Sequence, residues 1–221
     1  MNSTKQLFTI GHSNHSIDDF ITLLQTHGIT AVADVRSHPY SRYLPHFNKS
    51  ELEAALQHVG IEYRFLGQEL GARPNESSCY VDGKALYEKI AATPLFARGI
   101  KRLINGVKTH RIALMCAERD PITCHRSILV CQHLRNFDIK INHILNDGSL
   151  ESHNALEERL LKLHGLEQSL SSQVIQLSLF EIPELPDKAN NSLTPEERLQ
   201  QAYQRQGDKI AYVEKEQPKH E

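Results

Sequence analysis

Residues 116–126 form the densest group of chemically active side chains in this sequence. They include two thiols, an imidazole, carboxylates and arginines, among them Cys116, Glu118, Cys124, His125 and Arg126. Arginine guanidiniums bind phosphate or carboxylate groups through paired hydrogen bonds. Carboxylates and imidazoles act as general acids and bases. This stretch therefore predicts an anion-binding site with acid/base chemistry.

Two polar blocks in the N-terminal half carry side chains of similar kinds. One comprises Gly11, His12 and Ser13, and the other comprises Asp34, Arg36, Ser37 and Arg42. Taking the three blocks as one site, we predict catalytic roles for His12, Asp34, Glu118, Cys124 and His125. We predict substrate binding by Gly11, Ser13, Arg36, Ser37, Arg42, Cys116 and Arg126. For the second block, the alternative is a structural ion pair between Asp34 and Arg36.

The cysteines differ in what their positions predict. Cys124 is expected in the first turn of a helix capped by Thr123, where the helix dipole and neighbouring cations favour a thiolate. Cys116 ends a strand and is either a ligand-binding thiol or a small buried hydrophobe. Cys131 is expected to pack on an apolar helix face. In the phosphatase or rhodanese pattern an arginine follows the cysteine by six residues, whereas Arg126 follows Cys116 only after ten.

A metal site is a further use for the same residues. Zinc could be held by Cys116, Cys124 and His125, but no Cys-x-x-Cys pair supports such a site. The 13 histidines are scattered, without a metal-type pair such as His-x-x-x-His. We therefore predict no cofactor and leave metal binding open.

Each polar block directly follows a predicted strand. Apolar runs predict strands at residues 7–10, 29–35, 62–66, 112–116 and 139–145. Helices are predicted after Ser16, Asn48, Thr93 and Thr123 and at about residues 152–164. This alternation is typical of an α/β fold, with a single doubly wound, mostly parallel sheet and helices on both faces, over residues 1–165. Because the loops after parallel strands meet at one edge, we expect the three blocks to converge.

Composition limits the class of protein. The 221 residues carry a formal net charge of −2, which excludes a chain-wide basic field for non-specific DNA binding. No segment is long and apolar enough to span a membrane, and the first residues have no signal-peptide core. We therefore expect a cytoplasmic protein with reduced thiols. Residues 166–221 are polar and predict a largely disordered tail with a short helix near Thr194.

Three motifs are characteristic in combination. They are residues 9–14 (Thr-Ile-Gly-His-Ser-Asn), residues 34–42 (Asp-Val-Arg-Ser-x-Pro-x-Ser-Arg) and residues 115–126 (Met-Cys-Ala-Glu-x-x-Pro-x-x-Cys-His-Arg). The set resembles the bacterial domain-of-unknown-function 488 family over about residues 7–165. That family has no settled reaction, so the resemblance supports placing the site in these blocks without naming its chemistry.

The tail contains a second resemblance, at residues 176–180. Gln176, Leu177, Ser178, Leu179 and Phe180 resemble, at every position, the pentapeptide that binds the bacterial sliding clamp, the beta subunit of the DNA polymerase. The resemblance implies that Leu179 and Phe180 enter an apolar pocket while the Gln176 amide forms hydrogen bonds. The alternative is an amphipathic strand that docks back on the domain.

Together these patterns predict a bacterial DNA-repair or nucleotide-processing protein. We expect a hydrolase-type enzyme that acts on DNA or a nucleotide through arginine, histidine and carboxylate groups and is tethered to the clamp. One alternative is a thiol-dependent redox or sulfur-transfer enzyme using Cys124. The other is a non-catalytic module that binds a nucleotide or a modified base.

Overall fold

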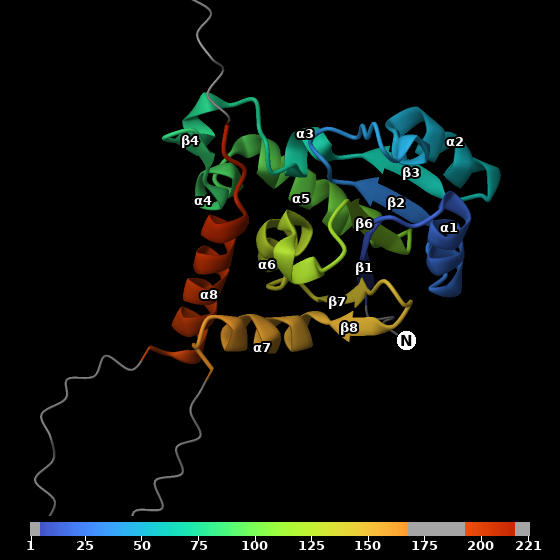
Figure 1. Cartoon of the computed structure of the whole chain (residues 1–221). Helices are drawn as coiled ribbons and strands as arrows, with labels where there is room; N and C mark the ends of the chain where they lie inside the picture. Colours follow the sequence, from blue (N-terminus) through green and yellow to red (C-terminus); the bar gives the residue numbers. More distant parts are fainter. Residues whose placement is uncertain (1–4, 168–192, 215–221) are drawn as a thin grey trace, which may run out of the picture.

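A twisted sheet with helices on both faces forms the centre of the molecule (Figure 1). The structure, a computed structural model, describes residues 5–167 and 193–214. Within these residues the main sheet consists of β1 (Lys5–Gly11), β2 (Ala31–Asp34), β3 (Glu62–Phe65), β6 (Ile112–Cys116), β7 (Ile139–Ile144) and β8 (Leu150–Ser152). The strand order is β3-β2-β6-β1-β7-β8, and only the β7–β8 pair is antiparallel. The predicted mostly parallel α/β fold is confirmed.

Helices cover the two faces of the sheet in separate groups. One face is covered by α1 (Ile17–Thr26) and α2 (Lys49–His58). The other is covered by α3 (Gly67–Leu70), α4 (Tyr87–Ala91), α5 (Pro94–Gly106) and α6 (Gln132–Leu134). Short connections are η1 (Pro45–Phe47), η2 (Ser77–Cys79) and η3 (Pro121–Thr123), with a small hairpin of β4 (Tyr80–Val81) and β5 (Lys84–Ala85). Because both faces are covered, the central strands are apolar on both sides.

Strand β6 shows how the sequence produces this layering. All of its residues are buried. Ile112 and Leu114 pack in the core beneath α5, whereas Ala113 and Met115 pack in the core beneath α1 and α2. Side chains of a strand point alternately to its two faces, so an unbroken apolar run fits only a strand covered on both. Strand β6 lies between β2 and β1, which places the loops after these three strands side by side.

The segment after β6 differs in detail from the prediction. Thr123 does not cap the following helix but ends the η3 turn, which Asp120 caps by accepting a hydrogen bond from the backbone N–H of Ile122. The next helical stretch, η4 (Arg126–Cys131), is a π-helical turn. Such turns are rare and occur often at functional sites. Propensity cannot predict one, because the same residues also fit an ordinary α-helix.

The C-terminal region also differs from the predicted tail. After α7 (His153–Leu163), helix α8 (Pro195–Ile210) packs beside α7 and the η4 turn (Figure 1). Thr194 and Glu197 form a capping box at its start, and Leu199, Ala202 and Tyr203 give it a buried face. Residues 193–214 therefore belong to the folded domain. Among the helices described, none is long and apolar enough to cross a bilayer.

Candidate functional site

A cavity of about 660 Å³ opens at the carboxyl edge of β1, β2 and β6. Its wall includes side chains from all three polar blocks: His12, Arg36, Ser37, Cys116, Glu118 and His125. The remaining wall comes from His38, Tyr40, Ser41, residues 72–73, Tyr87, Ala117 and residues 210–213. The parallel sheet therefore brings together residues that lie more than a hundred positions apart in the sequence, as the strand pattern predicts.

Backbone contacts fix the loops around this cavity. The N–H of His12 donates to the carbonyl of Cys116 at 2.8 Å, and the N–H of Ser13 donates to that of Ala117 at 3.0 Å. A Cβ on Gly11 would lie 1.9 Å from the carbonyl oxygen of Glu118, so only glycine allows the loops to approach so closely. Neither Gly11 nor Ser13 is part of the cavity wall. Their predicted substrate contact is therefore replaced by a role in loop geometry.

Asp34 and Arg36 form a buried ion pair at the end of β2, which we name the Asp34–Arg36 pair. Arg36 donates from Nε and from its backbone N–H to Asp34 Oδ1, both at 3.0 Å, and from Nη2 to Oδ2 at 2.7 Å. The Tyr63 hydroxyl donates to the same carboxylate at 2.8 Å. Asp34 is fully buried and is not part of the cavity wall. It therefore holds Arg36 in place and lies away from the cavity, which differs from the predicted catalytic position.

Arg36 keeps little of its hydrogen-bonding capacity free. Nη2 also donates to the carbonyl of Phe47 at 2.8 Å, and Nη1 lies 3.3 Å from His12 Nε2. A guanidinium has five N–H donors, so these contacts with the described residues leave one on Nη1. Because Arg36 is part of the cavity wall, this donor is the one available to an anion. Burial, followed by the charge of Arg36, lowers the pKa of His12 to about 4 and keeps its ring neutral.

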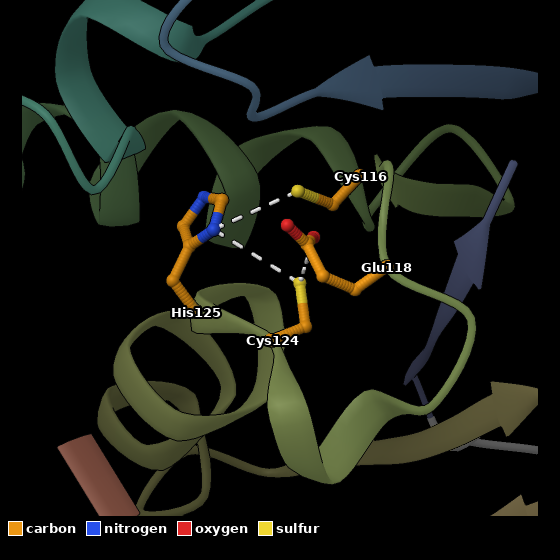
Figure 2. Close-up of side chains that lie close together, drawn as sticks. All are labelled: Cys116, Glu118, Cys124 and His125. Atoms are coloured by element: carbon orange, nitrogen blue, oxygen red, sulfur yellow. Dashed lines mark hydrogen bonds between the residues drawn. The ribbon is translucent and has the colours of Figure 1, made fainter. Parts of the chain in front are cut away.

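Four donor side chains converge on the other side of the cavity (Figure 2). We name Cys116, Glu118, Cys124 and His125 the Cys–His–Glu cluster; their ligand atoms lie within 4.8 Å of one another. The Cys116 and Cys124 sulfurs lie 3.6 and 3.9 Å from His125 Nδ1. The Cys124 thiol donates to Glu118 Oε2 at 3.0 Å. On the far side of the ring, His125 Nε2 lies 2.9 Å from the carbonyl of Val35.

The hydrogen bond to Val35 decides which ring nitrogen of His125 carries the proton. A carbonyl oxygen only accepts, so Nε2 must be the donor. In the neutral ring, the Nδ1 lone pair then points at the two sulfurs. Burial opposes the charged form, but the hydrogen bond with Cys124 and the charge of that residue raise the pKa of His125, and the charged ring would donate from Nδ1 to the sulfurs. The two cysteines are tightly coupled. Burial works against ionisation of Cys124, but its hydrogen bond with Cys116 and the charge of Arg126 bring its pKa well below the usual value.

The position of Cys124 corrects the prediction of a first-turn cysteine. Its backbone is extended and precedes η4. Its carbonyl accepts from the N–H of Ile128 at 3.1 Å, and its sulfur accepts from the N–H of Arg126 at 3.4 Å. Cys124 therefore lies between η3 and η4, just before a helix start, which favours negative charge. It is buried behind the cavity wall, which contains Cys116 but not Cys124.

Two predicted anion-binding arginines lie outside the cavity wall. Arg126 is fully buried. It donates from Nη1 to the carbonyl of Glu118 at 2.6 Å and from Nη2 to that of Arg119 at 3.3 Å. These contacts hold the loop after β6 in place and leave Arg126 away from any ligand in the cavity. Arg42 is exposed and follows Ser41, which is part of the wall.

Three wall residues, Arg73, Tyr87 and Tyr212, were not among the predicted site residues. Arg73 lies in the connection between α3 and η2. Its guanidinium stacks over the Tyr212 ring at 4.3 Å. Tyr212 follows α8, and its carbonyl accepts from the N–H of Ala85 at 2.9 Å. The sequence gives no signal for Tyr212, because its place depends on the docking of α8.

Comparison with known proteins gives one match. None of the curated proteins and none of the solved structures compared is similar to this chain. The family described as "Domain of unknown function DUF488" matches residues 16–132, just over half of the chain. The matched region contains β2 and β6 with the loops that follow them, and therefore the Asp34–Arg36 pair and the Cys–His–Glu cluster. The chain belongs to the DUF488 family.

Proposed function

We propose that the cavity binds a phosphate-bearing nucleotide or nucleic-acid substrate and that the protein is a hydrolase-type enzyme of DNA repair or nucleotide processing. The observation that carries the proposal is the Arg36 guanidinium, which Asp34 orients so that one N–H of Nη1 remains for the cavity. Arginines held in a fixed orientation are well suited to phosphate recognition. Arg73 adds a second guanidinium to the same wall.

The entrance of the cavity supports a nucleic-acid substrate. Tyr40, in the cavity wall, is 74 % exposed, and nearby Tyr43 is 89 % exposed. Exposed aromatic rings beside cations are the groups on which unpaired bases stack. Arg42 lies between the two tyrosines in the sequence and is also exposed. Such local contacts supply affinity without the chain-wide positive charge that this protein lacks.

The acid/base groups of the proposed reaction are Glu118 and the cavity histidines. Glu118 is the carboxylate that the described wall presents to a substrate, since Asp34 lies behind Arg36. Burial and the charge of Arg36 lower the pKa of His12 to about 4, so this ring is neutral near pH 7 and only a weak base. A thiol mechanism through Cys124 receives less support, because Cys124 is not part of the wall. Replacing Cys124 by serine tests the thiol mechanism: unchanged turnover would exclude it, and a loss of turnover would be compared with Glu118→Gln at equal metal content.

A screen against single-stranded, damaged and modified oligonucleotides tests the substrate class. Fluorescence anisotropy would measure binding, and mass spectrometry would detect products. We expect Arg73→Ala to weaken binding and to reduce the slope of log K against log salt by about 0.7. Tyr43→Ala should cost about 1–3 kcal/mol of binding if a base stacks there. Arg98→Ala, an exposed arginine on α5, is the matched control.

The outcomes separate the alternatives. Binding that depends on Arg73 but never gives a product would assign the chain to non-catalytic modules. If no oligonucleotide or nucleotide binds, or if Arg98→Ala weakens binding as much as Arg73→Ala, the cavity is not a nucleic-acid site.

We also propose that residues 176–180 tether the protein to the sliding clamp. This peptide lies outside the described residues, so the support is its sequence alone. A tether would raise the local concentration of the cavity at DNA. A peptide spanning residues 172–183 should bind purified clamp, and replacing Leu179 and Phe180 by alanine should abolish binding. An unmodified peptide that fails to bind contradicts the tether and leaves the cavity proposal unchanged.

A further inference from the structure

The Cys–His–Glu cluster has the composition of a transition-metal site. Its donors are two sulfurs, an imidazole nitrogen and a carboxylate oxygen. Thiolate and imidazole ligands favour zinc over magnesium or calcium, which prefer oxygen. The three heavy-atom distances within the cluster are 3.0, 3.6 and 3.9 Å. Around tetrahedral zinc, neighbouring ligand atoms lie about 3.3–3.8 Å apart. The donors are therefore already close to the spacing that zinc requires.

The surroundings of the cluster also match a metal site. The Val35 carbonyl orients the His125 ring and fixes the proton on Nε2, so that Nδ1 is free to coordinate. Metal-bound histidines usually have a partner of this kind on the other nitrogen. Arg126, fully buried, donates its Nη1 N–H to the Glu118 carbonyl. Its positive charge offsets the negative charge that two thiolates and a carboxylate leave around one Zn²⁺.

We propose that Cys116, Cys124, His125 and Glu118 bind a single Zn²⁺ ion at the wall of the cavity. This inference goes beyond the proposed function and does not depend on it, because it needs only the four donors and their spacing. The cysteines and His125 are buried, whereas Glu118 is exposed to the cavity side. Glu118 is therefore the ligand that water or a substrate oxygen can displace, and the other three residues hold the ion. Zinc sites with one exchangeable position are typical of catalysis.

Metal analysis of the full-length protein tests the proposal without an activity assay. We expect about one zinc per chain after dialysis against zinc and removal of the excess. Substitution with Co²⁺ should give visible bands of a tetrahedral site and near-ultraviolet sulfur-to-cobalt absorption. Cys116→Ser and His125→Ala should each lose zinc, whereas Glu118→Gln should retain it with weaker affinity. Cys131→Ser, another buried cysteine from the adjoining η4 turn, should bind zinc like the unmodified protein.

The measurements on the unmodified protein keep the test independent of variant folding. A folded, reduced protein that takes up neither zinc nor cobalt would overturn the proposal. Binding that Cys116→Ser and His125→Ala leave unchanged, with circular dichroism showing both variants folded, would also overturn it. A disulfide between Cys116 and Cys124, found by mass spectrometry in protein purified under reducing conditions, would do the same. None of these outcomes affects the test of oligonucleotide binding, so the two proposals can fail separately.

Discussion

The Asp34–Arg36 pair and the Cys–His–Glu cluster lie at the same edge of the sheet but use their polar atoms in opposite ways. Asp34 accepts hydrogen bonds from Arg36 and Tyr63, and most donors of Arg36 are already bound to protein groups. In the cluster, the donor atoms lie close to one another, and backbone contacts to His125 and Cys124 set their orientation. An ion pair whose hydrogen bonds are nearly all made within the protein, which we call saturated, stabilises the fold and fixes the position of Arg36. A set of sulfur and nitrogen donors that converge on one point is suited to binding a metal ion.

The largest effect is expected from breaking the saturated pair. Asp34→Ala leaves the Arg36 guanidinium buried without its partner, which typically costs about 3–5 kcal/mol of unfolding free energy. Urea denaturation would measure the loss. Arg64→Ala removes a surface ion pair with Glu62 on neighbouring β3, and should cost less than about 1 kcal/mol. If Asp34→Ala and Arg64→Ala lower the unfolding free energy equally, Asp34 and Arg36 do not form a buried ion pair in solution.

Acid should destabilise the protein through a second buried assembly, in which His143 and His153 are hydrogen-bonded to each other and to two hydroxyl groups. Thr9 Oγ1 contacts His143 Nδ1 at 2.8 Å, His143 Nε2 contacts His153 Nδ1 at 3.0 Å, and the Tyr203 hydroxyl lies 3.0 Å from His153 Nε2. Burial, then the charge of Arg135, lowers the pKa of His153 to about 4.

The lowered pKa sets the direction of the pH dependence. The unfolded chain binds the His153 proton near pH 6.5 but the folded protein does not, so stability is present above pH 6.5 and falls as the pH drops towards 4. At about 1.4 kcal/mol per pKa unit, the shift corresponds to about 3 kcal/mol. Urea titrations from pH 7 to 4 would measure it. His153→Gln should reduce the dependence of the unfolding free energy on pH, whereas His58→Gln, at an exposed position on α2, should leave it unchanged. If His153→Gln has the same pH dependence as the unmodified protein, His153 is not the group responsible.

Zinc should stabilise the cluster and leave the Asp34–Arg36 pair unaffected. A ligand that binds only the folded state, at 100 times its dissociation constant, adds about 2.7 kcal/mol. Thermal unfolding with added Zn²⁺ and with a chelator would show the difference, which Cys116→Ser should remove. If Asp34→Ala, rather than Cys116→Ser, removed the response to zinc, the division of roles between the two assemblies would be wrong.

A smaller effect is expected from Tyr63→Phe. The variant removes the hydroxyl that donates to Asp34 and leaves the carboxylate with its Arg36 contacts. A hydrogen bond to a charged group contributes about 1.5–3 kcal/mol. Tyr43→Phe, at an exposed tyrosine, is the control and should leave denaturant stability unchanged. A loss in Tyr63→Phe as large as that of Asp34→Ala would mean that the ring, not the hydroxyl, is what matters.

The sequence predicts the sheet and the convergence of the polar blocks because both depend on local patterns. Apolar runs mark the strands, and polar residues after Ile10, Asp34 and Cys116 are brought to one edge by parallel pairing. The number of strands on each side of β6 is not contained in these patterns. It depends on which strands pair, and pairing is a contact between distant segments.

The roles of individual site residues could be predicted only in part. Whether Asp34 is a base or an anchor depends on Tyr63 and Phe47, which come from other elements. Arg126 carries the charge expected of an anion ligand, but nearby carbonyls occupy its donors. Tyr212 completes the cavity wall only because α8 returns to the domain. In each case the deciding contact depends on how the chain folds around the residue, and the spacing of residue types carries no information about it.

The return of α8 to the domain also bears on the proposed clamp tether, because the segment that carries residues 176–180 begins and ends at helices of the folded domain. Residues 168–192 connect α7 to α8, and these two helices pack against each other (Figure 1). In the sequence, residues 176–180 therefore lie between two described helices and not beyond the last one. The shorter arm, residues 168–175, spans at most about 30 Å when fully extended. If a clamp binds residues 176–180, this arm sets the largest distance between the clamp and the end of α7. The same length would limit which part of the DNA the cavity can reach.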